Sequence, residues 1–372
     1  MRRIYCLLLL IIIFLIACQP RQRPVRDHSS TEPLEYIDYI YEGGSFELPV
    51  TGATGYAANN IPVFRSANIF SSFAGTLDAG QGFTILEEED DWWHIEINNI
   101  RGWVLHKYCF INLPDIIPSI VYNNTNTYAS LFRSSGLDIP NITGRALYEG
   151  RDLNTRLGRD EYISPVLYAM AGKIFAAQQA ALAEGNTLII YEAFRPAEAH
   201  NELHEHFSLL VETNTLVRSG ITADSFNIRW FLAEAPYNHQ RGTAIDTSLG
   251  RIDTWEVKTT GHYVYIHITE YTEYPMQTPV HELSVAAAVF DSNVHARSTT
   301  SWRSAVISDK ASPGTVLLQR YCTNAGLTPL ASEWWHFNDL ENTDVAIDID
   351  ITGEFHITRT YSKPPIPATS EN

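Results

Sequence analysis

The chain has 372 residues, of which 45% are hydrophobic, 12% aromatic and 19% charged, and this composition excludes disordered, collagen-like and disulfide-scaffold proteins. Its length suggests about two domains, because single hydrophobic cores stop growing at roughly 250 to 300 residues. The 43 acidic and 26 basic residues give a formal net charge of −17. That charge argues against nucleic acid as a partner, because phosphate binding needs a basic surface.

The first residues have the features of an export signal. Two early arginines precede an uncharged apolar run over residues 7–17, which is too short to span a membrane because spanning needs about 20 apolar residues. The sequence Leu-Ile-Ala-Cys at 15–18 resembles the bacterial lipobox. We therefore expect residues 1–17 to be a lipoprotein signal peptide and Cys18 to carry the lipid that anchors the protein in the membrane. In the alternative interpretation, Cys18 is incidental to an ordinary secretory segment.

Residues 18–48 are predicted to form a polar tether, and residues 49–113 a small all-β barrel. In the second segment, short β-type runs alternate with turn residues. The acidic stretch at 87–91 is interpreted as a solvated hairpin turn between two of these runs. The expected strands cover residues 61–65, 75–77, 83–86, 92–97 and 102–105.

Several short motifs follow one another in this β region. They are Val-Phe-Arg at 63–65, Gly-Gln-Gly at 80–82, Asp-Trp-Trp-His-Ile at 91–95 and Arg-Gly-Trp-Val at 101–104. Their order resembles that of bacterial SH3-like domains. The resemblance implies a module that binds cell-wall peptides.

Residues 114–362 mix helical and strand patterns, which predicts an α+β domain. Pro165 is placed at a helix start, and apolar residues at helical spacing continue the helix to about Glu184. A β-rich stretch follows at 187–194. The proline-rich tail at 363–372 is predicted to be disordered.

Two segments of this domain bring metal-ligand side chains close in sequence. The first, at 238–246, has a glycine between His239 and Asp246 that lets the backbone turn so that both side chains face one point. The second, Glu-Trp-Trp-His at 333–336, supplies His336. Two neutral imidazoles and one carboxylate make a three-ligand zinc site with a fourth position open for water, as catalysis requires.

Two more residues fit hydrolytic chemistry. Glu333 precedes His336 by three residues and is a candidate general base that later returns the proton to a leaving amine. Arg195 follows a β-type run, and its permanent charge could hold a developing oxyanion. Each residue alone has an ordinary explanation, such as a hydrogen-bonded histidine, a turn cap at Asp246 or an ion pair of Arg195 with a neighbouring glutamate.

The order of Phe-Arg-Pro at 194–196, the segment at 238–246 and Glu-Trp-Trp-His at 333–336 resembles the zinc D-alanyl-D-alanine dipeptidase and carboxypeptidase family of the vancomycin-resistance type. The resemblance covers about residues 120–340. It implies an α+β zinc peptidase domain after the SH3-like barrel. It also implies zinc bound by His239, Asp246 and His336, with Glu333 as general base and acid and Arg195 stabilising the transition state.

Two departures from the family concern the substrate. Tyr237 stands where the family usually has a serine that helps to hold the substrate carboxylate. The segment after Pro-Met at 275–276 lacks the Phe-Asp with which dipeptidases grip a free amine, and His281 or Glu282 could substitute. An insertion at about 262–274 also lengthens the gap between ligands. A longer muropeptide is therefore a candidate substrate.

A second histidine pair, His200 and His204, has the spacing of neighbours on one helix face. It lacks the glutamate that follows the first histidine in metalloprotease helices. We interpret this pair as part of an exposed polar face. Cys109 and Cys322 are the cysteines beyond the signal segment, and nothing in their positions decides whether they pair.

These features predict a lipid-anchored zinc peptidase of the cell envelope that acts on D-alanine-containing peptides of peptidoglycan and is held near the wall by its SH3-like domain. A D-Ala-D-Ala dipeptidase and a D,D- or L,D-carboxypeptidase both remain open. A protein of another class is also compatible with the sequence, namely a non-catalytic wall-binding lipoprotein with a structural or lost metal site.

Overall fold

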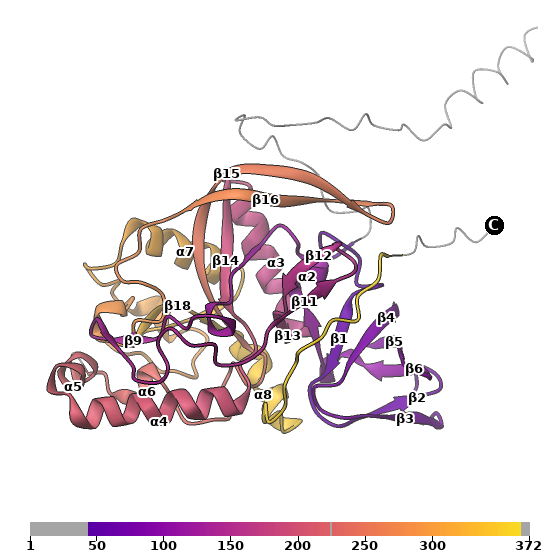
Figure 1. Cartoon of the computed structure of the whole chain (residues 1–372), viewed down its shortest axis with the longest axis horizontal. Coiled ribbons are helices and arrows are strands. Elements are labelled where there is room, and N and C mark those ends of the chain that lie inside the picture. Colours follow the sequence, from indigo (N-terminus) through magenta and orange to yellow (C-terminus); the bar gives the residue numbers. More distant parts are fainter. Residues whose placement is uncertain (1–43, 224, 366–372) are drawn as a thin grey trace, which may run out of the picture. The chain divides into compact units, whose positions relative to one another are not determined.

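Two large β-sheets organise the computed structural model, which describes residues 44–223 and 225–365 (Figure 1). Strands dominate the N-terminal part, and helices and strands mix after it. The structure thus confirms a mixed α+β chain that begins with an all-β region.

Several predicted features fall outside the described residues. They are the signal segment at 1–17, the lipidation site Cys18, the tether up to residue 43 and the tail from residue 366. Within the described part of the chain, no helix combines the length and apolar character needed to cross a membrane. Cys109 and Cys322 are both buried and unpaired.

The first sheet has eight antiparallel strands in the order β13-β7-β1-β4-β5-β6-β2-β3. Alternate residues of β5 are buried, so Trp93 and Ile95 face the core, as expected for a strand with one covered face. The strands are β1 (Thr54–Ala57), β2 (Ile61–Phe64), β3 (Phe73–Leu77), β4 (Gly82–Glu89), β5 (Trp92–Ile97), β6 (Ile100–Leu105), β7 (Cys109–Asn112) and β13 (Pro165–Leu167).

The acidic residues 87–91 are exposed and connect β4 to β5, as predicted, but the turn is shorter than expected, and a second local prediction is wrong. The turn is short because β4 runs to Glu89 and Glu88 accepts hydrogen bonds from Trp93 Nε1 and the Tyr168 hydroxyl. Pro165 begins strand β13 and not a helix; β13 lies at the sheet edge, where a proline is tolerated because its missing N–H breaks no ladder. Helix α3 begins three residues later, at Tyr168.

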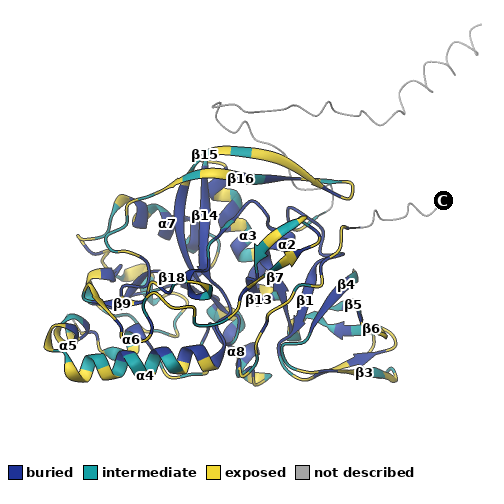
Figure 2. Ribbon diagram, viewed as in Figure 1, coloured by how far each residue is buried: buried dark blue, intermediate teal, exposed yellow. Residues whose placement is uncertain are grey.

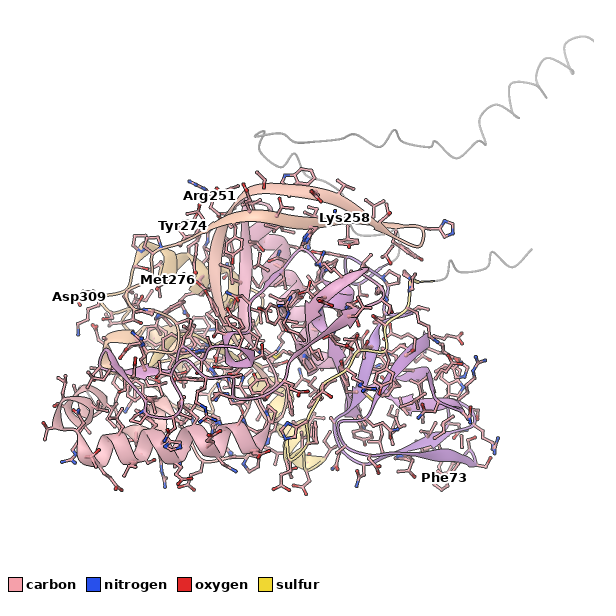
Figure 3. The ribbon with its side chains drawn as sticks, viewed as in Figure 1. Phe73, Arg251, Lys258, Tyr274, Met276 and Asp309 are labelled. Carbon is pink, nitrogen blue, oxygen red and sulfur yellow. The ribbon has the colours of Figure 1, made fainter. Side chains whose placement is uncertain are left out.

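The second sheet has the order β17-β18-β15-β14-β8, with β16 paired to β15, and it is antiparallel except for β14 and β8. Every residue of β14 is buried (Figure 2). Residues 262–274, predicted to be an insertion, contain β16, which pairs with β15 in a long ribbon; Arg251 and Lys258 lie on β15 (Figure 3). The strands are β8 (Val121–Tyr122), β14 (Asn186–Glu192), β15 (Ala244–Thr260), β16 (Tyr263–Glu273), β17 (Thr328–Leu330) and β18 (Glu333–Asn338).

Helices α3 and α7 pack against each other, and both contact the second sheet. Helix α7 begins with Pro313 after Ser312, whose hydroxyl accepts from Thr315 N, a typical capped start. The helices are α2 (Leu113–Ile116), α3 (Tyr168–Leu182), α4 (Ala197–Thr213), α5 (Thr215–Thr222), α6 (Ile228–Phe231), α7 (Pro313–Asn324) and α8 (Leu340–Asp348). Two short hairpins are also present: β9 (Arg133–Ser134) with β10 (Leu137–Asp138), and β11 (Arg151–Asn154) with β12 (Arg159–Tyr162).

After α8 the chain returns to the first sheet. Tyr361 N donates to Thr54 Oγ1, and Lys363 N donates to Gly52 O. Two later segments therefore hydrogen-bond to the N-terminal part of the chain: β13 pairs with β7, and the residues after α8 bind residues in and just before β1.

Candidate metal centre

The predicted metal ligands lie on two paired strands and on the loop that precedes one of them. Asp246 is the third residue of β15 and stands directly opposite His336 of β18, while His239 lies in the loop before β15. The loop turns at Gly242, which has a φ of +66°. A Cβ atom there would lie 2.7 Å from the ring of Phe110, so both backbone conformation and space require glycine.

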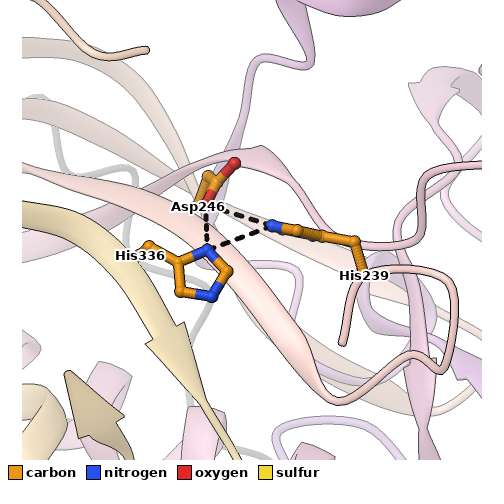
Figure 4. Close-up of side chains that lie close together, drawn as sticks. All are labelled: His239, Asp246 and His336. Atoms are coloured by element: carbon orange, nitrogen blue, oxygen red, sulfur yellow. Dashed lines mark hydrogen bonds and ion pairs between the residues drawn. The ribbon is translucent and has the colours of Figure 1, made fainter. Parts of the chain in front are cut away.

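The ligand atoms of these three side chains form a small triangle (Figure 4). His239 Nε2 lies 3.2 Å from Asp246 Oδ1 and 3.2 Å from His336 Nδ1, and the last two atoms are 2.9 Å apart. All three residues are buried. Ligands of tetrahedral zinc at 2.0–2.1 Å stand about 3.3 Å apart, so the triangle has the size that one zinc ion needs.

The hydrogen bonds around the two imidazoles fix their tautomers. His239 Nδ1 is 2.6 Å from the carbonyl oxygen of Ala193, which can only accept, so Nδ1 carries the proton. His336 Nε2 is 2.9 Å from Asn338 Oδ1, which also accepts from Asn238 Nδ2. When both rings are neutral, as metal binding requires, the lone pairs of His239 Nε2 and His336 Nδ1 point at Asp246 Oδ1. In that state the three acceptors repel one another unless a cation binds there, whereas without a metal ion a second proton on one of the rings supplies the positive charge.

The second oxygen of Asp246 is held by other residues. Oδ2 lies 3.1 Å from His281 Nε2 and 3.5 Å from Arg195 Nη2. Burial by itself would raise the pKa of Asp246, but the charge and hydrogen bonds of the surrounding histidines outweigh it and hold that pKa well below its usual range. The carboxylate is thus kept ionised, as a metal ligand must be.

Glu333 lies beside the triangle, with Oε2 3.9 Å from His336 Nδ1. Two residues three positions apart on a regular strand face opposite sides of the sheet. Here the pairing of β17 with β18 shifts between Pro329 and Leu330, and this bulge lets Glu333 and His336 share one side. Burial, and then the charge of Asp246, raise the pKa of Glu333 well above its usual range.

Arg195 follows β14, is buried, and forms an ion pair with Glu192, which is the ordinary alternative considered for it in the sequence. Its Nε donates to Glu192 Oε2 at 2.8 Å, and its Nη2 donates to the same oxygen. The guanidinium carbon lies 5.1 Å from the centre of the Phe132 ring. The other oxygen of Glu192 accepts from Asn126 Nδ2 and from the Tyr148 hydroxyl. The arginine is therefore fixed on several sides.

A cavity of about 490 Å³ opens beside these groups. Arg195, Glu333 and all three predicted metal ligands line it, so residues from distant parts of the sequence meet at one space. The other lining residues are Phe132, His200, Asn227, Arg229, Trp230, Phe231, Leu232, Ala233, Glu234, Tyr237, Ala296 and Leu330.

The predicted substrate residues divide between the cavity and the protein interior. Tyr237 lines the cavity, whereas His281 and Glu282 are not among its lining residues. Glu282 accepts hydrogen bonds from Gly136 N at 3.1 Å and from the Ser284 hydroxyl at 2.7 Å. His281 is fully buried beneath Asp246.

The interpretation of His200 as part of an exposed polar face is wrong. His200 is buried in the first turn of α4, 3.1 Å from Arg195 Nη1 through Nδ1 and 2.6 Å from Ala233 O through Nε2. Its place beside Arg195 depends on how α4 packs, which spacing along the chain does not show. His204, one turn later, is half-buried.

Comparisons with known proteins identify one domain and one partial similarity. Residues 59–109 match the bacterial SH3 domain family. The chain is also 30% identical over 83 residues to a Bacillus subtilis (strain 168) protein named "Putative N-acetylmuramoyl-L-alanine amidase YrvJ". That similarity covers 19% of this chain and 16% of the relative, so the chain spans about a sixth of the length of the protein it matches.

Proposed function

We propose that this protein is a zinc metallopeptidase that hydrolyses D-alanine-containing peptides of peptidoglycan. One observation carries the proposal: two imidazole lone pairs and a carboxylate oxygen converge within 3.2 Å of one another, beside Glu333 and Arg195, on the wall of a cavity. A closed structural zinc site would have four protein ligands. Three ligands at a cavity wall leave a position for water or substrate.

The roles of the side chains follow from their positions. His239, Asp246 and His336 would hold the ion, which supplies Lewis acidity and lowers the pKa of a water molecule. A metal ion beside Glu333 would lower its raised pKa again, so that the ionised Glu333 takes a proton from the attacking water and returns it to the leaving amine. Arg195 stabilises the negative charge that develops on the carbonyl oxygen, because a buried guanidinium interacts strongly with charge in a water-poor cavity.

The cavity lining favours a carboxypeptidase over a strict dipeptidase. A free amine needs a carboxylate partner, and Asp246 and Glu333 are already assigned to the ion and the proton. Among the described residues that line the cavity, Glu234 is the further acid, and because its side chain is exposed, water would screen an ion pair with an amine and leave it weak. Glu282 is occupied elsewhere by Gly136 and Ser284. We therefore place a longer muropeptide stem, without a free amine next to the cleaved bond, in the cavity.

The location of the protein is part of the proposal. The bacterial SH3 match and the similarity to a protein named as an amidase support an association with peptidoglycan. Lipidation at Cys18 would hold the enzyme in the membrane of the cell envelope, facing the wall. Two attachments would raise the local concentration of substrate without changing the chemistry.

One assay distinguishes the peptidase from the non-catalytic, wall-binding alternative. The zinc-loaded chain is incubated with D-Ala-D-Ala, a tetrapeptide stem and a pentapeptide stem, with and without a chelator, and released amino acids are measured. We expect release of terminal D-alanine from a stem peptide, loss of release with chelator, and recovery when zinc is restored. Absence of release from every peptide by a zinc-loaded, folded chain would reject the peptidase function.

A further inference from the structure

His200 contacts the proposed transition-state arginine but has no part in the chemistry described so far. It lies on the first turn of α4 and is 3% exposed. Its two ring nitrogens reach different partners, Arg195 Nη1 at 3.1 Å and Ala233 O at 2.6 Å. Both partners line the cavity. His200 therefore links a charged group of the site to the backbone of another segment that lines the cavity.

The partners of His200 decide its hydrogens. The carbonyl oxygen of Ala233 can only accept, so His200 Nε2 carries the proton. Nδ1 is then unprotonated and accepts from Arg195 Nη1. Burial, and then the charge of Arg195, lower the pKa of His200 to about 3, which agrees with a neutral ring at all ordinary pH values.

The remaining hydrogens of Arg195 can be assigned in the same way. A guanidinium has five N–H bonds. Nε and one Nη2 hydrogen are directed at Glu192, and the second Nη2 hydrogen faces Asp246 Oδ2 at 3.5 Å. His200 takes one Nη1 hydrogen. The hydrogen bonds in the described part of the chain thus leave one N–H, on Nη1, for a ligand in the cavity.

We propose that His200 is a positioning residue that holds Nη1 of Arg195, so that the remaining N–H is directed at the carbonyl oxygen of the substrate. This inference rests on the proposed function, because it assigns the arginine to a developing oxyanion. Glu192 alone holds the Nε and Nη2 edge and leaves the Nη1 end without a fixed partner. His200 supplies that partner and, through Ala233, ties its position to the cavity wall.

Three variants test this role. His200→Leu removes both hydrogen bonds while filling the space. His200→Gln keeps them, because a glutamine amide offers one acceptor and one donor about as far apart as the two ring nitrogens. His204→Leu, one turn later on α4, is the matched control because His204 contacts none of the proposed catalytic groups. Should the leucine variant not fold, His200→Phe replaces it, since a phenyl ring keeps the shape of the imidazole and offers neither a donor nor an acceptor in its place.

The expected result is a selective loss of turnover. His200→Leu should lower kcat about 10- to 100-fold with KM and zinc content unchanged, because a displaced oxyanion donor costs rate and not ground-state binding. His200→Gln should recover most of that loss, and His204→Leu should match the parent. Full kcat in a folded His200→Leu, or a glutamine variant as impaired as the leucine variant, would overturn the inference.

A second readout does not depend on hydrolysis. Crystal structures of the parent and of His200→Leu show directly where the Arg195 guanidinium lies. We expect Nη1 to leave its parent position while Nε stays on Glu192, and an unmoved Nη1 would overturn the inference. If the parent hydrolyses no peptide, the proposed function fails, while this structural comparison still decides whether His200 positions the arginine.

Discussion

Asp246 belongs to two neighbouring groups of buried metal-ligand residues, and the two differ in what neutralises them. Asp246 Oδ1 forms one group with His239 and His336, and its carboxylate forms the other with Glu192 and His281. The second group already contains a cation, because the Arg195 guanidinium bonds to Glu192 and lies 3.5 Å from Asp246 Oδ2. The first, when its two imidazoles are neutral, contains only lone pairs. Two groups of similar residue types can thus differ in their source of positive charge: an arginine of the protein neutralises one, and a bound metal ion would neutralise the other.

This difference divides the site into a part that takes a metal and a part that keeps an arginine. Arg195 cannot lose its charge, and its guanidinium already supplies the positive charge between Glu192 and Asp246. The two parts share one carboxylate, so each oxygen of Asp246 has a separate task. We expect one metal ion per chain.

The largest expected effect comes from a variant of Glu333 that should lose peptide hydrolysis but keep zinc binding. Glu333→Gln keeps the shape of the side chain but cannot accept a proton, so turnover should fall by about 10²- to 10⁴-fold. Zinc content should stay at the parent value, because Glu333 is not one of the three ligands. Peptide release and metal analysis on the same preparation measure both. Turnover close to that of the parent would remove Glu333 from the mechanism.

Glu47 shows what happens to a buried carboxylate that has neither an arginine nor an ion beside it. It accepts from Ser119 and Gln179, yet burial raises its pKa to about 7. Because the folded pKa lies above the unfolded value of about 4.5, its stabilising contribution is complete below that pH and is lost as pH rises to about 7.

The expected size of this effect is about 1.4 kcal/mol for each unit between the two pKa values. The difference in unfolding free energy between the parent and Glu47→Gln should therefore change across pH 4.5–7 and be level outside that window. Denaturant unfolding at a series of pH values, with chelator present, measures it. A difference that is constant from pH 4 to 8 would show that Glu47 titrates normally.

The smallest expected effect is on zinc affinity, and it comes from removing the partner of Asp246 Oδ2, the oxygen that does not face His239 and His336. His281→Leu removes the hydrogen bond to Oδ2, which should weaken zinc affinity about 10- to 100-fold, as for other outer partners of metal ligands. His281→Gln, which keeps a donor, should lose less. Competition with a coloured chelator gives both affinities. Equal affinities for parent and His281→Leu would show that Oδ1 alone determines binding.

The sequence predicted the parts of the site that depend on short-range spacing. His239 and Asp246 are joined by one loop with a required glycine, and Glu333 and His336 lie on one strand. These pairs could be proposed without knowing the fold. The bulge that turns Glu333 toward His336 was not visible, because it depends on pairing with β17.

Features that depend on packing between distant segments were missed. His200 has the pattern of a polar helix face, and only the contact of α4 with Arg195 and Ala233 shows that it is buried. Pro165 has the features of a helix start, but pairing with β7 makes it the first residue of a strand. In both cases tertiary contacts outweigh a local preference that is correct for an isolated segment.

Metal analysis of the purified chain tests the central claim most directly. After zinc loading and removal of excess ion, the parent should hold about one zinc per chain, and His336→Ala and Asp246→Asn should hold far less while remaining folded. The control variant His204→Leu should keep the parent value. A folded parent that binds no zinc, or ligand variants that bind as much as the parent, would contradict a metal centre at His239, Asp246 and His336.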